Sequence, residues 1–169
     1  MKRLLILVVM LVMLVCGSAF AQESFNAQGS VLVPNLQVWF MSSDSWMVPG
    51  MSLTNISSVP VQCRVTYYDH DGNELTYLEE TYTGGSNFVR VATGRDFDIP
   101  AKSTRFNTLR RPSSRMVAYA YAVVEWKSTA DPLLRKALVG GGEQQRLHRT
   151  SSGMALTQPR FLINDGEPF

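Results

Sequence analysis

The sequence predicts an all-β protein, built as an antiparallel β-sandwich of about seven to nine strands. Apolar and polar residues alternate with a two-residue period through most of the chain, and the apolar spacing typical of helices is scarce. Short apolar segments are separated by turn signals rich in Gly, Pro, Asn and Asp. This combination is typical of strands that place one face on a core and the other in water.

The clearest strand covers residues 59–68, where apolar and polar side chains alternate. Residues 69–73 follow as a hairpin turn because Gly72 tolerates a positive φ, and residues 74–78 return as the partner strand. Residues 116–126 form the longest expected strand. Since both of its faces are largely apolar, we expect it in the centre of a sheet.

Upstream, residues 31–33 and 36–41 are expected to be strands separated by Pro34. Proline cannot donate a hydrogen bond to a neighbouring strand, so Pro34 indicates an edge strand or a bend between two sheets. The other expected strands are residues 51–56, 96–99, 104–109, 134–139 and 160–163.

Three segments are expected to differ from this pattern. Residues 83–95 contain three glycines and are interpreted as a loop with one short strand at residues 88–91. Residues 140–153 are rich in glycine and polar side chains, which predicts a mobile loop of the kind that carries binding residues. Residues 131–136 could form one helical turn, capped by Asp131. Among sandwiches, the immunoglobulin-like type fits the strand number and length best.

The first 21 residues carry the three-part pattern of a secretory signal peptide. Lys2 and Arg3 precede the apolar residues 4–15, and Ala19-Phe20-Ala21 offers small residues at a cleavage site. The apolar run is shorter than the roughly 20 residues of a membrane-spanning helix. We therefore expect residues 1–21 to be removed and residues 22–169 to form one exported domain, periplasmic or extracellular, with no stable membrane span.

Cleavage would change the charge and the cysteine content of the chain. The full sequence has a net charge of +2, and loss of Lys2 and Arg3 would leave the mature chain neutral. Neutrality gives no general electrostatic reason to expect a nucleic-acid partner. Loss of Cys16 would leave Cys63 alone, which excludes an internal disulfide. Cys16 is not expected to carry lipid, because Val15 stands where a lipoprotein signal has a small residue.

Several residues invite a catalytic or metal-binding interpretation that the sequence does not favour. Asp69 and Asp71 suggest calcium, but an ordinary hairpin turn explains them, since the spacing of an EF-hand loop fails. Cys63 alternates with valines and is expected to be buried, and Glu125 is expected at a strand end beside an arginine. We expect no catalytic residue, no cofactor and no metal site, and hence no enzyme.

The candidate binding residues are aromatic and basic. Trp39 and Trp46 flank a polar loop and could form an aromatic platform, although core packing is the commoner role for tryptophan. Arg146, His148 and Arg149 fall in the glycine-rich segment of the arginine-rich second half. Together these residues could recognise a surface glycan.

The chain resembles a group of small exported bacterial immunoglobulin-like β-sandwich proteins of uncharacterised function. The resemblance rests on Leu-Thr-Asn at residues 53–55, on residues 65–72, on Ile-Pro-Ala at 99–101, on Val-Val-Glu-Trp at 123–126 and on residues 163–169. It spans most of residues 22–169. The resemblance implies the sandwich fold and no site residue.

These observations predict an exported, non-enzymatic binding or structural module of the cell envelope or extracellular space. A protein partner is the first expectation, because exposed strand edges can accept a partner strand. A carbohydrate-binding module that uses exposed Trp and Arg residues is the alternative. A hydrolase is the third and weakest hypothesis, since no pair of acids or nucleophile with a base stands out.

Overall fold

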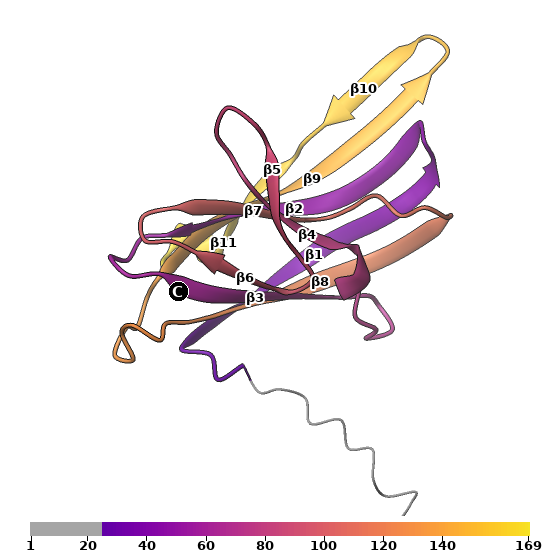
Figure 1. Ribbon diagram of the computed structural model, residues 1–169. Helices are drawn as coiled ribbons and strands as arrows, with labels where there is room; N and C mark the ends of the chain where they lie inside the picture. Colours follow the sequence, from indigo (N-terminus) through magenta and orange to yellow (C-terminus); the bar gives the residue numbers. More distant parts are fainter. Residues whose placement is uncertain (1–24) are drawn as a thin grey trace, which may run out of the picture.

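The computed structural model describes residues 25–169, which form eleven strands joined into one antiparallel sheet (Figure 1). The strands are β1 (Gly29–Ser42), β2 (Ser45–Asn55), β3 (Val61–Tyr68), β4 (Glu79–Thr83), β5 (Val89–Thr93), β6 (Asp96–Ile99), β7 (Thr104–Leu109), β8 (Met116–Lys127), β9 (Leu138–Thr150), β10 (Gly153–Thr157) and β11 (Arg160–Ile163). Two single turns of 3₁₀ helix, η1 (Thr76–Leu78) and η2 (Asn164–Gly166), complete the elements.

The prediction of an all-β, antiparallel protein is confirmed. The expected seven to nine strands are too few, because β4 and β10 were not expected; the short strand expected at residues 88–91 is present as β5. The expected signal peptide, residues 1–21 with Cys16, lies outside the described residues. No helix within residues 25–169 is long and apolar enough to cross a membrane.

The sheet divides at β2. One side of β2 pairs with β9 along its full length, whereas the other side pairs first with β1, at Trp39 and Met47, and then with β7, from Gly50 onward. β1, β8, β3 and β6 form one half of the sheet, called the β1 half, and β7, β4 and β5 form the other, called the β7 half. Residues 48–51 are all buried, because the inward face of β2 changes where its partner changes.

The two halves almost close on each other. β5 and β6 are the last strands at the two ends of the strand order, yet only residues 94–95 separate them in sequence. The N–H of Gly94 donates to Glu79 O at 3.1 Å in the β7 half, and Arg95 O accepts from the N–H of Val65 at 2.9 Å in the β1 half. One short connection therefore holds both ends of the sheet together.

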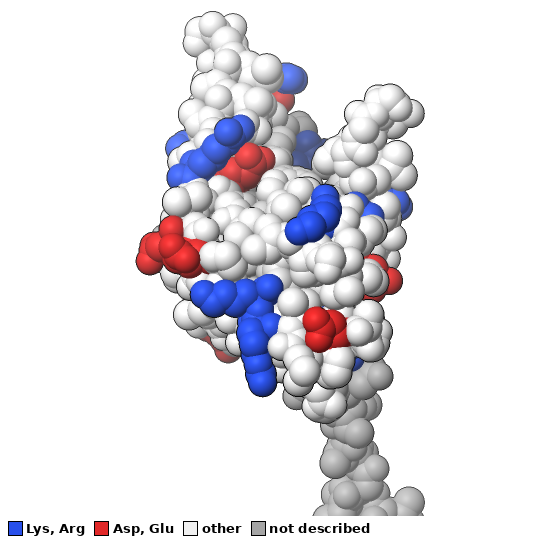
Figure 2. Space-filling view, turned by 90° about the vertical axis from the view of Figure 1, so that its left-hand side faces the viewer, with Lys and Arg blue, Asp and Glu red and all other residues white. Residues whose placement is uncertain are grey.

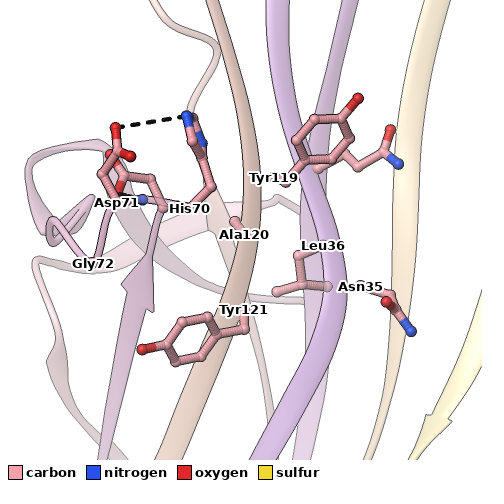
Figure 3. Close-up of a pocket in the computed structure, with 10 residues that line it drawn as sticks. Asn35, Leu36, His70, Asp71, Gly72, Tyr119, Ala120 and Tyr121 are labelled. Carbon is pink, nitrogen blue, oxygen red and sulfur yellow. Dashed lines mark hydrogen bonds and ion pairs between the residues drawn. The ribbon is translucent and has the colours of Figure 1, made fainter.

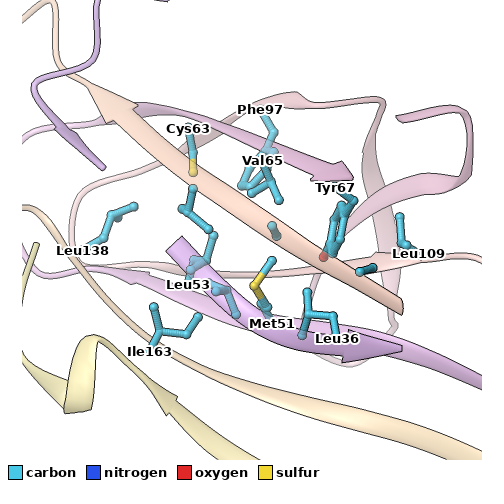
Figure 4. Close-up of a cluster of buried hydrophobic side chains, with 14 of the residues drawn as sticks. Leu36, Met51, Leu53, Cys63, Val65, Tyr67, Phe97, Leu109, Leu138 and Ile163 are labelled. Atoms are coloured by element: carbon cyan, nitrogen blue, oxygen red, sulfur yellow. The ribbon is translucent and has the colours of Figure 1, made fainter. Parts of the chain in front are cut away.

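The core fills the space between the two halves (Figure 4). Met51 and Leu53 of β2 and Val65 and Tyr67 of β3 are fully buried members of one continuous cluster. Trp126 of β8 is also fully buried, and its indole N–H donates to Phe169 O at 2.9 Å, which fixes the end of the chain on the core.

A buried polar network crosses this core. The hydroxyl of Tyr67 donates to Asn107 Oδ1 at 2.8 Å, and Asn107 Nδ2 donates to Glu79 Oε1 and to Thr81 Oγ1, both at 2.9 Å. Glu79 is 2% exposed, and this burial raises its pKa to about 8. The network joins β3 in the β1 half to β4 and β7 in the β7 half.

Pro34 does not split a strand, as the sequence suggested, but it does lie where β1 pairs with a neighbouring strand on one side only. β1 runs through Pro34 beside β8, the register with β8 shifts between Val33 and Leu36, and pairing with β2 begins only at Trp39. Asn35 has a φ of 60°, a conformation that Asn tolerates better than most residues. The β-bulge, together with the unpaired side of β1 at this position, accommodates the residue that has no N–H.

The glycine-rich residues 140–153, expected as a loop, form most of β9 and the turn to β10. A Cβ added to Gly142 would lie 2.0 Å from the ring of Phe161, and one on Gly50 would lie 2.4 Å from the ring of Phe106. An aromatic ring from the neighbouring strand thus occupies the space of the missing side chain. These glycines serve packing within strands.

Two smaller expectations are wrong. Residues 74–78 do not form a strand: a single bridge joins Glu74 to Tyr68, and η1 follows. Residues 131–136 contain no helical turn, although Asp131 Oδ1 accepts from the N–H of Leu133 at 3.0 Å, as a turn-forming residue does.

Candidate functional site

The outer surface of the β1 half carries a pocket of about 630 Å³ (Figure 3). Three segments line it: the β1 bulge at residues 35–37, the turn at residues 69–72 after β3, and residues 119–121 of β8. The bulge widens β1 locally, and Ala120 turns its small side chain into the core, so the two strands leave room between their outward side chains. The pocket therefore results from the bulge that Pro34 and Asn35 create.

Two tyrosines of β8 project from this surface on either side of Ala120 (Figure 3). Tyr119 is 66% exposed and Tyr121 is 38% exposed, where an antiparallel sheet normally shows polar side chains to water. The ring of Tyr121 stacks on Tyr68, with centroids 5.2 Å apart and planes at 21°. His70 meets Tyr119 edge-on, with centroids 6.4 Å apart and an angle of 74°. Both rings are thus held by a neighbour and still present surface to solvent.

The turn at residues 69–73 positions the polar wall of the pocket. Asp69 Oδ1 accepts the backbone N–H groups of Asp71 and Asn73, both at 2.9 Å. The bond from the N–H of Asn73 is the main reason why the pKa of the Asp69 carboxyl is lowered. The Asp71 carboxylate lies 3.7 Å from His70 Nε2. In residues 25–169, no three His, Cys, Asp or Glu side chains gather closely enough to hold a metal ion.

The two predicted tryptophans do not form a common platform. Trp39 pairs with Met47, and the neighbouring pair is Phe40 with Trp46, so the indoles lie on opposite faces of the β1–β2 hairpin. Trp39 supports the guanidinium of Arg146 at 5.4 Å from its ring. Trp46 packs on the core, and its buried Nε1 has no hydrogen-bond partner within residues 25–169.

The predicted basic residues are brought close to these tryptophans on β9. Arg146, His148 and Arg149 are all exposed. His148 Nδ1 lies 3.3 Å from Ser45 Oγ, and Arg149 Nη1 lies 3.4 Å from Asp44 Oδ1. Arg146 and His148 share a face with Trp39, while Arg149 lies on the opposite face with Trp46. The predicted set therefore divides between two surfaces.

These residues belong to a hairpin that projects beyond the core, in yellow in Figure 1. β10 pairs with residues 146–150 of β9, and its other edge has no partner strand within residues 25–169. All five residues of β10 are exposed, and Met154 and Leu156 are 59% and 56% exposed. We call β10 and residues 146–150 the hairpin arm.

The remaining candidate residues have structural surroundings. Cys63 is fully buried, and burial raises the pKa of its thiol well above the ordinary value. Glu125 is half-buried on β8 in register with Arg64, whose guanidinium binds the Asp96 carboxylate at 2.6 Å. On the face shown in Figure 2, acidic and basic side chains are interspersed, and no patch of one sign is seen there.

Sequence reasoning missed the tyrosine pocket. The alternation of residues 116–126 puts Tyr119 and Tyr121 on the same side of the expected strand. Both faces looked apolar, however, so the tyrosines were expected to be covered. Alternating alanines at 118, 120 and 122 were the available signal, because they identify the face that packs most closely.

Comparisons with known proteins leave the chain without a family. No protein-family model matches it, and no curated protein matches it. A partial likeness is found to the solved structure of Thermotoga maritima 1070, which is 10% identical, with 82% of this chain and 94% of that chain covered. The TM-score is 0.42, a likeness too weak to carry an argument.

Proposed function

We propose that the protein is an exported, non-enzymatic binding module of the cell envelope or extracellular space, and that it takes up a strand of a partner protein at β10. The leader-like residues 1–21 support export. The observation that carries the binding proposal is the open, unprotected edge of β10.

Four strands have only one neighbouring strand within residues 25–169, and three of them carry features that discourage pairing on the open side. β6 contains Asp96 and Asp98, β11 begins with Arg160 directly after Pro159, and β5 contains Arg90 beside a β-bulge of its own. Charges, prolines and bulges are the means by which proteins protect edge strands. β10, with the sequence Gly-Met-Ala-Leu-Thr, has none of them.

The backbone of β10 defines what it can bind. The loop of two residues at 151–152 makes Thr150 and Gly153 a hydrogen-bonded pair, so the N–H groups of Met154 and Leu156 point toward the open edge. A row of free donors and acceptors at strand spacing is complementary to another extended backbone. The exposed side chains of Met154 and Leu156 would add apolar contacts with alternate residues of the partner.

A proline at position 156 tests this proposal. Leu156→Pro removes the outward N–H and leaves the bonds between β10 and β9 in place, whereas Leu156→Ser removes only the apolar side chain. With a photo-crosslinking residue at Thr157, we expect an adduct with one envelope protein in the parent protein and in Leu156→Ser, and none in Leu156→Pro. Equal adducts in both variants, or no adduct in the parent protein, would contradict strand addition; an adduct with a second copy would replace the partner by self-pairing.

The immunoglobulin-like sandwich stays a proposal. The two facing halves of the sheet support it, and the continuous hydrogen bonding through β2 argues for a single sheet that folds over. The carbohydrate-binding alternative, as based on Trp39 and Trp46, is weakened because the indoles lie on opposite faces. The hydrolase hypothesis gains no support from the fully buried Cys63.

A further inference from the structure

We infer that the tyrosine pocket on the outer face of the β1 half is a binding site for a neutral saccharide. This site is separate from the β10 edge in residues and in surface, so either proposal can fail without the other. Three features support the inference: the exposed tyrosine rings, the polar side chains around them and the local charge.

The rings are presented as a saccharide requires. A pyranose ring has a face of C–H groups that packs on the negative face of an aromatic ring, with its hydroxyls directed sideways. Tyr119 and Tyr121 stand two residues apart on one strand, and each is oriented by a ring behind or beside it, His70 and Tyr68 respectively. Because these neighbours already restrict the rotamers, little conformational entropy is left to be lost on binding.

The polar groups around the rings suit hydroxyl recognition. The side chains of Asn35 and Gln37 are exposed on β1, and Gln37 lies directly opposite Tyr119 in the sheet register. Their amides can both donate and accept, and the Asp71 carboxylate accepts, which matches hydroxyls that do both. The bulge is what places Asn35 at the rim of the pocket.

The charge around the pocket favours a neutral ligand. Two carboxylates, Asp69 and Asp71, line it, and no Lys or Arg is among its lining residues. A phosphate, a sulfated glycan or a uronic acid would therefore meet repulsion without a counter-charge. At about 630 Å³ the pocket has the size of typical ligand sites, roughly 300–1,000 Å³. It opens on the outer surface of the sheet, so a longer glycan can continue past it.

Binding to a glycan array tests the inference. The probes are neutral oligosaccharides of glucose, mannose, galactose and N-acetylglucosamine, together with sialylated and uronic-acid glycans. We expect selective signals among the neutral set, weakened by about tenfold or more in Tyr119→Ala and largely retained in Tyr119→Phe, because the ring and not the hydroxyl makes the stacking contact.

Tyr77→Ala is the matched control, since Tyr77 is 64% exposed on η1 and lies outside the pocket. It should bind as the parent protein does. Absence of any neutral signal, binding of acidic glycans alone, or equal loss in Tyr77→Ala and Tyr119→Ala would overturn the inference. A protein captured by the parent protein and lost in Tyr119→Ala, with no glycan bound, would assign the pocket to a protein partner instead.

Discussion

The tyrosine pocket and the hairpin arm are both exposed and partly apolar, yet they are built in opposite ways. Behind the pocket, β8 alternates Tyr119 and Tyr121 with Ala118, Ala120 and Ala122, and those alanines are buried in the core. In the arm, both faces of β10 are exposed, and only the ladder with β9 holds it. The first surface is supported by the core, and the second is supported by one strand.

This difference bears on how each surface can bind. A pocket whose walls are fixed by packing keeps its shape in the free protein, so its ligand can be small. Residues 146–148 of β9 also pair with β2, so β10 is the outermost strand of the arm, and a further strand would cover its open edge. We therefore expect a small ligand at the pocket and an extended polypeptide at the arm.

The core that supports the pocket should become less stable when Glu79 loses its proton. Its pKa in the folded protein, about 8, lies above its ordinary value of 4.5, so the folded protein keeps a proton that the unfolded chain loses. The contribution of Glu79 to the free energy of unfolding is therefore full below about pH 4.5. It falls by about 1.4 kcal/mol per pH unit as the pH rises toward 8. Urea unfolding between pH 5 and 9 should show a loss of several kcal/mol.

Glu79→Gln should flatten this pH dependence, because the amide keeps a neutral group in the buried network. Glu80→Gln is the control: this neighbouring side chain is only partly buried and binds Arg90 at 2.6 Å, so its variant should keep the slope. An unchanged slope in Glu79→Gln would show that the buried carboxyl does not set the pH dependence.

The base of β9 should behave as core even though its tip belongs to the arm. In Gly142→Ala the new Cβ would collide with the Phe161 ring, so we expect a loss of about 1–3 kcal/mol in thermal or urea unfolding. Gly141→Ala is the matched variant, because its Cβ would meet only a backbone oxygen at 3.4 Å. It should be neutral or slightly stabilising. Similar losses in both variants would show that the collision with the Phe161 ring is not the cause.

The smallest expected effects on stability come from one serine substitution in each of the two surfaces. Tyr121→Ser removes a stacked ring from the pocket and should cost about 1 kcal/mol. Leu156→Ser removes an exposed side chain from the arm and should change the unfolding free energy by less than about 0.5 kcal/mol. If the arm variant proves the more costly in urea unfolding, the arm packs more firmly than its exposure indicates.

Local pattern was sufficient for much of the fold. The strands at residues 96–99 and 104–109 and most of β3 and β8 coincide with the expected ones, because each has a two-residue alternation with turn residues at its ends. The interpretation failed at residues 140–153, and at Pro34 it divided one strand into two. There the sequence shows a proline or glycines, and the reason for them lies in a bulge and in rings from other strands.

The candidate site was harder to find than the fold. The sequence selected Trp39 and Trp46 because tryptophan is a common contact residue, but pairing places them on opposite faces. Alternation places the tyrosines of β8 on one face of the strand. Whether that face is covered depends on which strands pack against it. The alternating alanines mark the face that packs closely, but the strands that do or do not cover the other face lie far away in the sequence.

By itself, the sequence determined that the chain is antiparallel and all-β, because alternation and turn chemistry act between near neighbours. Only the tertiary structure decided that β2 divides the sheet, that Glu79 is enclosed and that Tyr119 and Tyr121 face solvent. The physical reason is that burial is a property of what packs against a residue. In this sheet the packing partners come from strands far apart in the sequence.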